Sequence, residues 1–586
     1  MFVSEITEAT PVNEEGAGGQ HVRPHGGPKA SSLIQTFFLV LGIVFLSMLG
    51  VGSTVLTVDV IRNQAEEQAI IGMSGLVPTI VGILAWLALV TLLSRARIVP
   101  RHQSVERIAL ILGTLLGATW VFIANCGPAF DALDLSSAAY ALGDRASVPS
   151  EFAEWYDYGK IIWGIDPATG AHADFHCYME RFPHQTPFIL LLRACQDIAG
   201  NKFHTLFQLV NAVSIGITWL LLCRIAYELS GDDRVSLVTL GLCLVFTPLV
   251  YYSTFIYGNL IGQALGLGAW FICILCCKED NSVSKQLLGF ALCSLLLAFS
   301  TLVKETMQIA SIAFAFCVLI YSLHTKRWFY LPFIVLPFLL TSLLLNPFLD
   351  KYEAQMGTDL HNAMPKTAWV VMGIGGGSER LAELGDGTLP KNDTEWPGYF
   401  DSYIWGDPRA EGFSSWDDFN AHYLQARLNR FAKNPAYTVK FFGRKLAIEW
   451  LEPSCECFLI SNHVINPGQF ASYMADVSRE YTTFAPLFYY GIANTISVTL
   501  ADIFQSLAAI GSLLWCLGAM KRRDDNLSIQ LLAIILVLGG ALLYLFWETK
   551  TQYILPFWLF LIPYSACGWT SLGQRIASHF KADERP

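Results

Sequence analysis

The chain has 586 residues, of which 53% are hydrophobic and only 15% are charged, and it contains 16 Trp. A water-soluble protein of this length carries far more charge on its surface, so the composition indicates a polytopic membrane protein and excludes a soluble globular one. The net charge of -10 resides mostly in polar loops, and the basic residues form short scattered clusters, so nothing indicates nucleic-acid binding.

Hydrophobic runs divide the chain into about twelve membrane-spanning helices. Residues 1–31 are rich in Gly, Glu and Pro and predict a disordered tail. The apolar span that follows from Leu33 is too long for the core of a cleaved signal peptide, so we expect it to be retained. A crossing helix needs about 20 apolar residues. By this criterion, spanning helices are expected at residues 33–57, 69–93, 108–128, 204–226, 235–254, 258–277, 286–303, 306–323, 328–347, 498–520, 527–547 and 553–572.

One further apolar stretch, Pro187–Ile198, is short and contains Arg193, which favours an interfacial or re-entrant helix over a complete crossing. This assignment satisfies the positive-inside rule, because an even number of crossings puts both termini and the basic loops in the cytoplasm. Those loops are at residues 94–107, 224–234, 278–285, 324–327 and 521–523. We therefore expect a multi-pass protein of the cell membrane with cytoplasmic N and C termini.

The predicted fold class is an all-α polytopic membrane protein with a large extracytoplasmic loop domain. The expected regions are a disordered cytoplasmic tail (1–31), two additional N-terminal helices (32–107), a transmembrane module (108–347) with 129–203 as its first outer loop, the extracytoplasmic loop domain (348–497), and the C-terminal helices with a short cytoplasmic tail (498–586).

Asp131 and Asp134 open the first outer loop, directly after an apolar span. Residues three apart share one face of a helix, so both carboxylates would face the same way. A carboxylate here could accept a proton from a hydroxyl nucleophile or orient it. Asp is also favoured at helix N-caps, so Asp131 could cap the amphipathic helix Leu133–Leu142, and the two roles are compatible.

Two charged pairs lie at short outer turns. Lys304 and Glu305 interrupt an apolar stretch, where ionisable side chains are costly. Lys304 could hold a phosphate as a point charge. Equally, it could be a turn residue whose ammonium group extends to the membrane surface, with no role in binding. Between the last two spans, Lys550 could supply a second phosphate contact close to Glu548, whereas Tyr553 is more typical of an aromatic belt at the interface.

Polar residues in two other segments are candidates for substrate binding. Tyr252 and Tyr257 could line a sugar site, although packing at the membrane interface is the favoured alternative. Arg181, His184 and Gln185 begin the short apolar helix, where Arg181 could contact a phosphate. His184 could act as a general base, but a structural histidine is the more common role.

The sequence contains no P-loop, no dinucleotide fingerprint, no H-E-x-x-H motif and no G-x-S-x-G elbow. We predict no essential cofactor, with a divalent metal as the open alternative. Four cysteines lie outside the spans or near their ends, and their spacing alone does not establish a disulfide. They are Cys126, Cys177, Cys455 and Cys457.

This arrangement resembles the GT-C superfamily of membrane glycosyltransferases, which includes protein mannosyltransferases and the bacterial lipid A aminoarabinose transferase. A closer likeness is to bacterial membrane proteins of this kind that share four ordered segments, from about Ile108 to Tyr564. The segments are Asp131…Ala139…Gly143, Tyr178–Gln185, Met372–Ile374 and Glu548–Tyr553. The chain departs from the family in two ways: its paired acids are three apart instead of adjacent, and the family's H-P-P-L helix entry is present only as His184-Gln-Thr-Pro187.

The resemblance implies transfer of a sugar from a polyprenyl-phosphate-linked donor to an extracytoplasmic cell-envelope glycan or lipid. It assigns the catalytic acid to Asp131 or Asp134, with Asp131 preferred because it lies closer to the helix end. For this function we expect Lys304, Lys550 and Arg181 to hold the lipid phosphate, and membrane lipids to surround the protein. A transporter or lipid-linked glycan flippase is the alternative, which would favour broken helices in two symmetric halves, and a noncatalytic assembly protein is a third.

Overall fold

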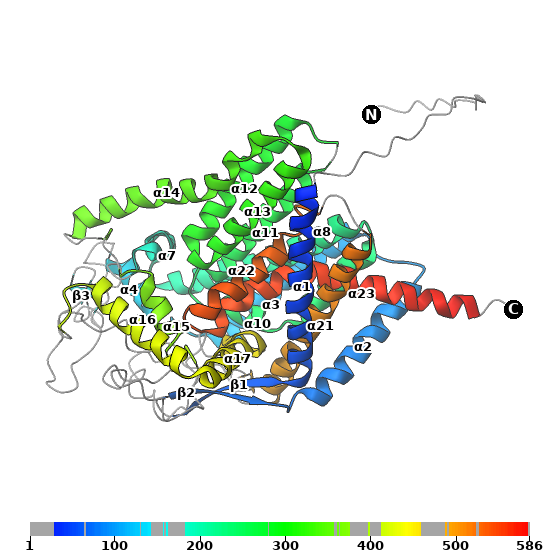
Figure 1. Ribbon diagram of the computed structural model, residues 1–586, viewed down its shortest axis with the longest axis horizontal. Coiled ribbons are helices and arrows are strands. Elements are labelled where there is room, and N and C mark those ends of the chain that lie inside the picture. The colour runs from blue at the N-terminus through cyan, green and yellow to red at the C-terminus, as the bar shows by residue number, and fades with distance from the viewer. Residues whose placement is uncertain are drawn as a thin grey trace.

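The structure is a computed structural model, and it describes residues 29–63, 66–128, 131–141, 156–157, 160–161, 182–278, 280–356, 360–361, 364–375, 397–398, 412–458, 487–488, 491–522 and 527–583. In this part of the chain the protein is predominantly helical (Figure 1). The α-helices are α1 (Lys29–Val55), α2 (Leu76–Arg95), α3 (His102–Ala124), α4 (Asp131–Ala141), α7 (Thr186–Ala199), α8 (Phe203–Ser230), α9 (Asp233–Val245), α10 (Pro248–Tyr251), α11 (Asn259–Cys276), α12 (Val283–Val303), α13 (Gln308–Thr325), α14 (Pro332–Met356), α15 (Thr367–Gly373), α16 (Trp416–Lys433), α17 (Pro435–Leu451), α21 (Ile492–Arg522), α22 (Leu532–Phe546) and α23 (Leu555–Asp583).

Short 3-10 turns connect several of these helices, and among the described residues four short strands pair into two separate two-stranded sheets. The turns are η2 (Pro183–Gln185), η3 (Gly200–Lys202), η4 (Tyr252–Thr254), η5 (Glu305–Met307), η6 (Trp328–Tyr330) and η9 (Thr551–Ile554). The strands are β1 (Thr57–Asn63), β2 (Glu66–Gly72), β3 (Tyr156–Asp157) and β4 (Lys160–Ile161).

The chain is a multi-pass helical membrane protein, as the sequence predicts. Within the described residues, nine segments are long and apolar enough to cross a membrane, one of which joins α7 with α8, and the bent pair formed by α9 with α10 and η4 would make a tenth. α22 and α23 coincide with the last two predicted spans, and α22 is a shorter apolar helix of 15 residues. The count of twelve crossings therefore stays a prediction.

The first two spans are joined by a β-hairpin that the sequence analysis did not foresee. β1 and β2 pair antiparallel, from Thr57 opposite Gly72 to Asn63 opposite Glu66. The prediction that a helix begins at residue 69 was wrong, because residues 69–72 belong to β2 and α2 begins only at Leu76. β-branched residues dominate β1, which favours a pleated strand over a helix.

A sharp bend interrupts the predicted span 235–254. α9 ends at Val245, and the chain turns by 63° into α10 and η4. Pro248 lies in the first turn of α10, where its missing N–H costs nothing and its fixed φ starts a new helix. The bend brings the following segment against α3, where Ser253 Oγ donates a hydrogen bond to the Gly117 carbonyl oxygen at 3.0 Å.

Small residues allow α3 and α8 to pack closely. A Cβ atom on Gly113 would lie 3.1 Å from the Cα of Gly216, and one on Gly117 would lie 3.0 Å from the Cα of Ala212. This small-xxx-small spacing is typical of helix contacts in membranes. On the same face of α8, Gln208 Nε2 donates to two backbone carbonyl oxygens, of Cys126 at 2.9 Å and Thr254 at 3.1 Å. Gln208 thereby fixes the backbone of Cys126, just after α3, beside the backbone of Thr254 at the end of η4.

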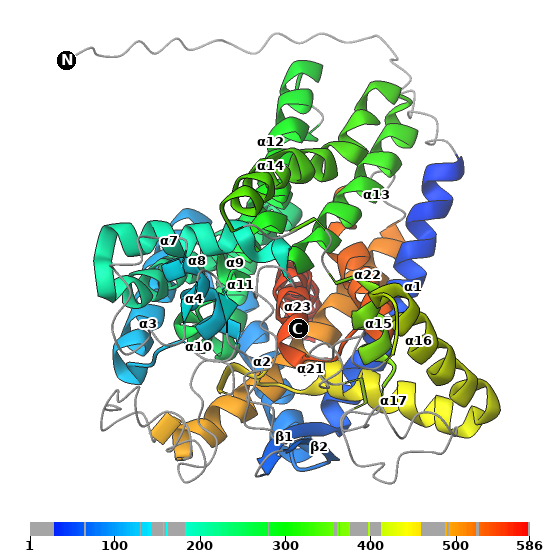
Figure 2. The same ribbon diagram turned by 90° about the vertical axis from the view of Figure 1, so that its left-hand side faces the viewer.

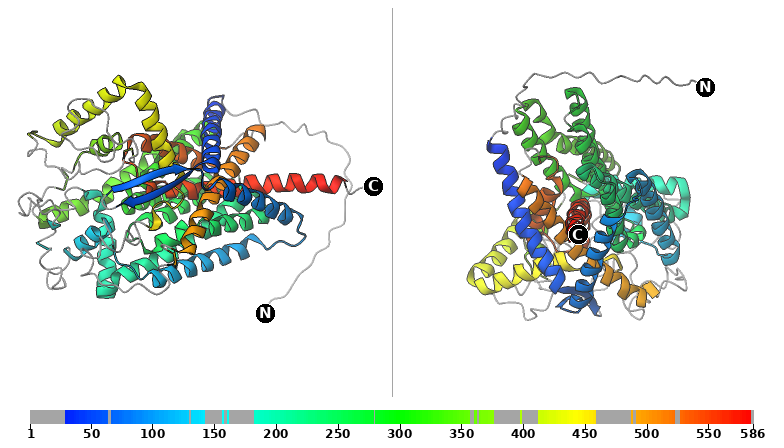
Figure 3. Two further views of the ribbon diagram at one scale, coloured as in Figure 1. Left: turned by 90° about the horizontal axis from the view of Figure 1, so that it is seen from below. Right: turned by 90° about the vertical axis from the view of Figure 1, so that its right-hand side faces the viewer.

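The shorter elements gather at one end of the bundle. α4, α7, α15 and α16 lie at the left of Figure 1, whereas the C-terminal end of α23 projects at the right. Figure 2 shows α4 and α7 on one side and α15, α16 and α17 on the other, with α23 between them. Figure 3 shows α1 along the outside of the bundle, where it packs against α21.

α7 is a separate 14-residue helix that packs against α4 and α8. At 1.5 Å per residue it measures about 21 Å, less than the roughly 30 Å of a hydrocarbon core. Gly200, with φ +56°, ends it before the chain continues into η3 and α8. This geometry agrees with the expectation that Pro187–Ile198 is not a complete crossing.

Candidate active site

Asp131 is the first residue of α4, and its side chain is half-exposed. It lies five residues after Cys126, whose carbonyl group is held by Gln208. Asp134 lies on the next turn of α4, but its side chain is outside the described residues. The choice between the two acids therefore stays a prediction.

Lys304 lies in the turn between α12 and η5, and only 8% of its surface is exposed. Its ammonium nitrogen lies 4.0 Å from the ring centre of Tyr257 and 5.7 Å from that of Tyr553. Gly258 makes this approach possible, because a Cβ there would lie 2.0 Å from the carbonyl oxygen of Val303. Burial lowers the pKa of Lys304 to about 7, against the opposing effect of the Asp131 carboxylate.

Lys550 approaches the same place from the turn after α22. Its ammonium nitrogen lies 3.1 Å from a carboxylate oxygen of the buried Glu548, and the hydroxyl of Tyr553 donates to the other oxygen at 3.0 Å. Burial disfavours the charge of Lys550, but Glu548 and then Asp131 outweigh it, so its pKa lies above the ordinary value.

These residues form one group, which we call the lysine cluster: Asp131, Tyr257, Lys304, Glu548, Lys550 and Tyr553. Tyr553 joins the two lysine turns, because its ring faces Lys304 and its hydroxyl bonds to Glu548, which pairs with Lys550. Asp131 belongs to the group through its charge, which acts on the pKa of both lysines. The structure therefore brings together the acid and the two cations that the sequence analysis singled out. Their chemical roles stay predictions.

Three other candidate residues, Gln185, Tyr252 and Arg181, differ in where the structure places them. Gln185 is joined to the lysine cluster, because its Nε2 donates to the hydroxyl of Tyr257. Tyr252 is fully buried, and its hydroxyl donates to the backbone oxygen of Cys455 at 2.6 Å, which is a packing role. Arg181 lies outside the described residues.

His184 and Glu305 form an ion-paired group beside the lysine cluster. His184 Nε2 lies 3.4 Å from one carboxylate oxygen of Glu305, and the ammonium group of Lys366 donates to the other. Lys366 precedes α15, in a segment that the sequence analysis treated only as part of the large loop. Its role was missed because no local pattern links it to Glu305, which is 61 positions away.

Two half-exposed tryptophans, Trp369 of α15 and Trp547 at the end of α22, lie next to this group. Their rings are nearly parallel, with centroids 5.8 Å apart and planes 10° apart. Trp369 also meets Phe182 edge-on at 6.0 Å and His184 at 6.5 Å. Neither tryptophan can be predicted as a site residue from the sequence, because Trp is common near membrane interfaces and no motif spacing distinguishes these two.

Buried acids hold the turn that carries Lys550. Thr551 donates from its backbone N–H to Glu456 at 2.8 Å and from its hydroxyl to Glu452 at 2.6 Å. Burial raises the pKa of Glu452, partly offset by these and other hydrogen bonds. Lys445 of α17 donates to the backbone oxygens of Gly373 and Trp547, the latter at 2.6 Å. One buried side chain thus ties the end of α15 to the end of α22.

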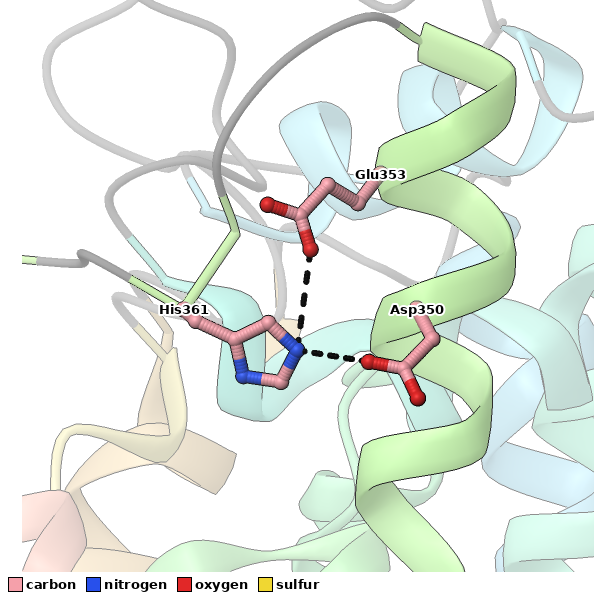
Figure 4. Close-up of side chains that lie close together, drawn as sticks. All are labelled: Asp350, Glu353 and His361. Atoms are coloured by element: carbon pink, nitrogen blue, oxygen red, sulfur yellow. Dashed lines mark hydrogen bonds and ion pairs between the residues drawn. The ribbon is translucent and has the colours of Figure 1, made fainter.

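A different group could hold a divalent cation (Figure 4). His361 Nε2 lies 2.8 Å from a carboxylate oxygen of Asp350 and 3.6 Å from one of Glu353, both on α14. The three ligand atoms lie within 4.8 Å of one another. Two carboxylates and an imidazole suit several divalent ions, but an ion pair with a protonated histidine explains the same distances. The metal therefore stays an open alternative.

Cys126, Cys455 and Cys457 are present as thiols, and Cys177 lies outside the described residues. Cys455 and Cys457 are buried, and Cys455 has a positive φ of 49° in the turn after α17.

The geometry of the lysine cluster suits an anion beside a hydroxyl group. Two ammonium groups can hold a phosphate oxygen each, as point charges in a partly buried place where electrostatic interactions are stronger than in water. The half-buried carboxylate of Asp131 can accept a proton from a hydroxyl within hydrogen-bond reach.

No family model matches the sequence, and no curated protein matches it. Two solved structures are similar to it in fold. ArnT from Cupriavidus metallidurans bound to undecaprenyl phosphate has 13% identity over 79% of this chain and 77% of that chain, with a TM-score of 0.31. The Archaeoglobus fulgidus oligosaccharyltransferase in its apo form has 12% identity over 82% of this chain, with a TM-score of 0.38, and this chain covers only 52% of its length. Because both TM-scores are below 0.5, they carry no argument about the site or the reaction.

Proposed function

We propose that this chain is a membrane glycosyltransferase that moves a sugar from a polyprenyl-phosphate-linked donor to a hydroxyl group of an extracytoplasmic cell-envelope glycan or lipid. One observation supports the proposal: Tyr553 joins Lys304 and Lys550 in one buried group, since its ring faces Lys304 and its hydroxyl bonds to the Glu548 that pairs with Lys550. The charge of Asp131 acts on both lysines. Two cations for a phosphate and a carboxylate for a hydroxyl match the needs of sugar transfer from a phosphate.

In the proposed reaction, the acceptor oxygen forms a bond to the anomeric carbon of the donor sugar as the bond from that carbon to the phosphate oxygen breaks. The hydroxyl proton passes to the carboxylate of Asp131. The leaving group is the lipid phosphate, whose additional negative charge is held by Lys304 and Lys550. Such positioned charges stabilise the transition state because they need no reorganisation during the reaction.

The test is transfer of a radiolabelled sugar from a polyprenyl phosphate to an envelope extract, in proteoliposomes that contain the full chain. We expect Asp131→Asn to lower the rate by about 100-fold or more, as removal of a general base typically does. Asp197→Asn, at an exposed acid of α7 that pairs with Arg193, is the matched control and should keep full activity.

Normal transfer by both the Asp131→Asn and the Asp134→Asn variants would contradict the assignment of the catalytic acid. Movement of the intact glycolipid across the bilayer without sugar transfer would instead identify a flippase.

A further inference from the structure

Next to the lysine cluster lies a second group of side chains, which we call the aromatic cluster: Phe182, His184, Glu305, Lys366, Trp369 and Trp547. Its two tryptophans are parallel and half-exposed, and its carboxylate is paired with a histidine and a lysine. A half-exposed aromatic surface beside hydrogen-bonding groups is the usual composition of a small-ligand site.

The two clusters are built from the same stretches of backbone. Gln185 contacts the lysine cluster through Tyr257, and the preceding His184 belongs to the aromatic cluster. Lys304 belongs to the lysine cluster, and the next residue, Glu305, belongs to the aromatic cluster. Likewise, Glu548 belongs to the lysine cluster and the preceding Trp547 to the aromatic cluster. Because consecutive Cα atoms are about 3.8 Å apart, the two clusters adjoin along three separate segments.

Backbone contacts hold the two segments that carry the tryptophans of the aromatic cluster. Lys445 donates to the backbone oxygens of Gly373 and Trp547, so it fixes the ends of the two helices that carry the tryptophans. Gly373 lies so close to this segment that a Cβ there would be 2.2 Å from the carbonyl carbon of Trp547. The backbone positions from which the two rings extend are therefore fixed relative to each other.

We propose that the aromatic cluster binds the sugar ring of the lipid-linked donor, with the apolar face of a neutral hexose packed on Trp369 and its hydroxyl groups bonded to Glu305 and His184. This inference rests on the proposed function. A sugar is covalently attached to its phosphate, so a phosphate held by Lys304 and Lys550 puts the sugar in the adjoining cluster. The Glu305 carboxylate accepts hydrogen bonds from hydroxyls and disfavours a uronic acid.

The test measures the binding of two kinds of ligand to the full chain in nanodiscs. One is undecaprenyl phosphate, and the other is the same lipid phosphate carrying one sugar, which is glucose, mannose or galactose. We expect Trp369→Ala to weaken binding of at least one sugar-bearing lipid by about three- to tenfold, the usual worth of one aromatic contact, and to leave undecaprenyl phosphate unaffected. Trp369→Phe should recover most of the loss. Trp328→Ala, at an exposed tryptophan of η6 at the other end of α13, is the matched control.

The outcomes separate the two proposals. If Trp369→Ala weakens both ligands equally, or weakens neither, the aromatic cluster does not bind the sugar, while binding of undecaprenyl phosphate by the wild type still supports the proposed function. If the wild-type chain binds neither ligand, the proposed function fails and the sugar site fails with it. Loss of both ligands in Lys304→Met, together with selective loss in Trp369→Ala, is the expected result.

Discussion

Lys304 and Lys550 both belong to the lysine cluster, but Lys304 is surrounded by aromatic rings and Lys550 by a carboxylate. The ammonium group of Lys304 contacts the rings of Tyr257 and Tyr553, and burial lowers its pKa to about 7. The ammonium group of Lys550 pairs with the buried Glu548, and its pKa is raised. The difference between the two lysines follows the close carboxylate of Glu548, because both ammonium groups are buried. The pKa of Lys550 is raised above its ordinary value, whereas the pKa of Lys304 is lowered into the physiological range.

The largest expected difference between the two lysines concerns stability. Lys550→Met leaves Glu548 buried without its cation, which should lower the free energy of unfolding by about 3–5 kcal/mol. Lys304→Met removes a cation that burial disfavours, so it should change stability by less than about 1 kcal/mol or increase it. Thermal unfolding in detergent measures both values.

A double variant sharpens this result. Lys550→Met combined with Glu548→Gln removes both charges and should recover most of the lost stability, without recovering sugar transfer. Equal destabilisation by the two single lysine variants would show that Glu548 does not distinguish them.

The second prediction concerns pH. Because the pKa of Lys304 is lowered to about 7, its charge is present below that pH and is lost as the pH rises. Affinity for a sugar-bearing lipid phosphodiester, whose own charge is constant, should fall by about tenfold per pH unit above 7, until the pKa of the complex is reached. Binding titrations between about pH 6 and 9 measure the slope.

Lys304→Arg should retain affinity across this range, because a guanidinium group keeps its proton. Lys304→Met should bind weakly at every pH and show no slope. A wild-type slope that persists in Lys304→Met would assign the titration to another group.

The smallest effect is expected at Tyr257, whose ring faces Lys304 and whose hydroxyl accepts from Gln185. Tyr257→Phe keeps the ring and removes only this hydrogen bond, worth about 1 kcal/mol, so KM for the donor should rise by about fivefold or less. Tyr252→Phe is the matched control, since its hydroxyl bonds to the Cys455 backbone, and it should lower stability without changing KM. A larger rise in KM for Tyr252→Phe than for Tyr257→Phe would contradict this division.

Local patterns in the sequence predicted the helical membrane fold and the residues that bear charge at its turns. Asp131, Lys304 and Lys550 were found because ionisable side chains are rare beside apolar spans. The assignment to one side of the membrane then implied that they could meet. Their spatial convergence agrees with this expectation, while the side of the membrane, the five regions and the roles of the site residues stay predictions.

The features that were missed depend on contacts between distant segments. Pro248 starts a new helix where one continuous span is predicted. The hairpin at Thr57–Gly72 takes the start of the second predicted span, because apolar β-branched residues satisfy both periodicities in a short window. Trp369, Lys366 and Lys445 acquire their places from tertiary packing alone. Periodicity reports which face of an element is apolar, and it does not report which partner covers that face.

Gln208 reaches from α8 to both Cys126 and Thr254 with a single amide nitrogen. Gln208 therefore couples two backbone segments mechanically. One precedes Asp131, and the other precedes Tyr257, whose ring faces Lys304. A displacement of either one must be transmitted to the other or must break a buried bond. Gln208 thus keeps the backbone just after α3 and the end of η4 in register, five residues before Asp131 and three before Tyr257 respectively.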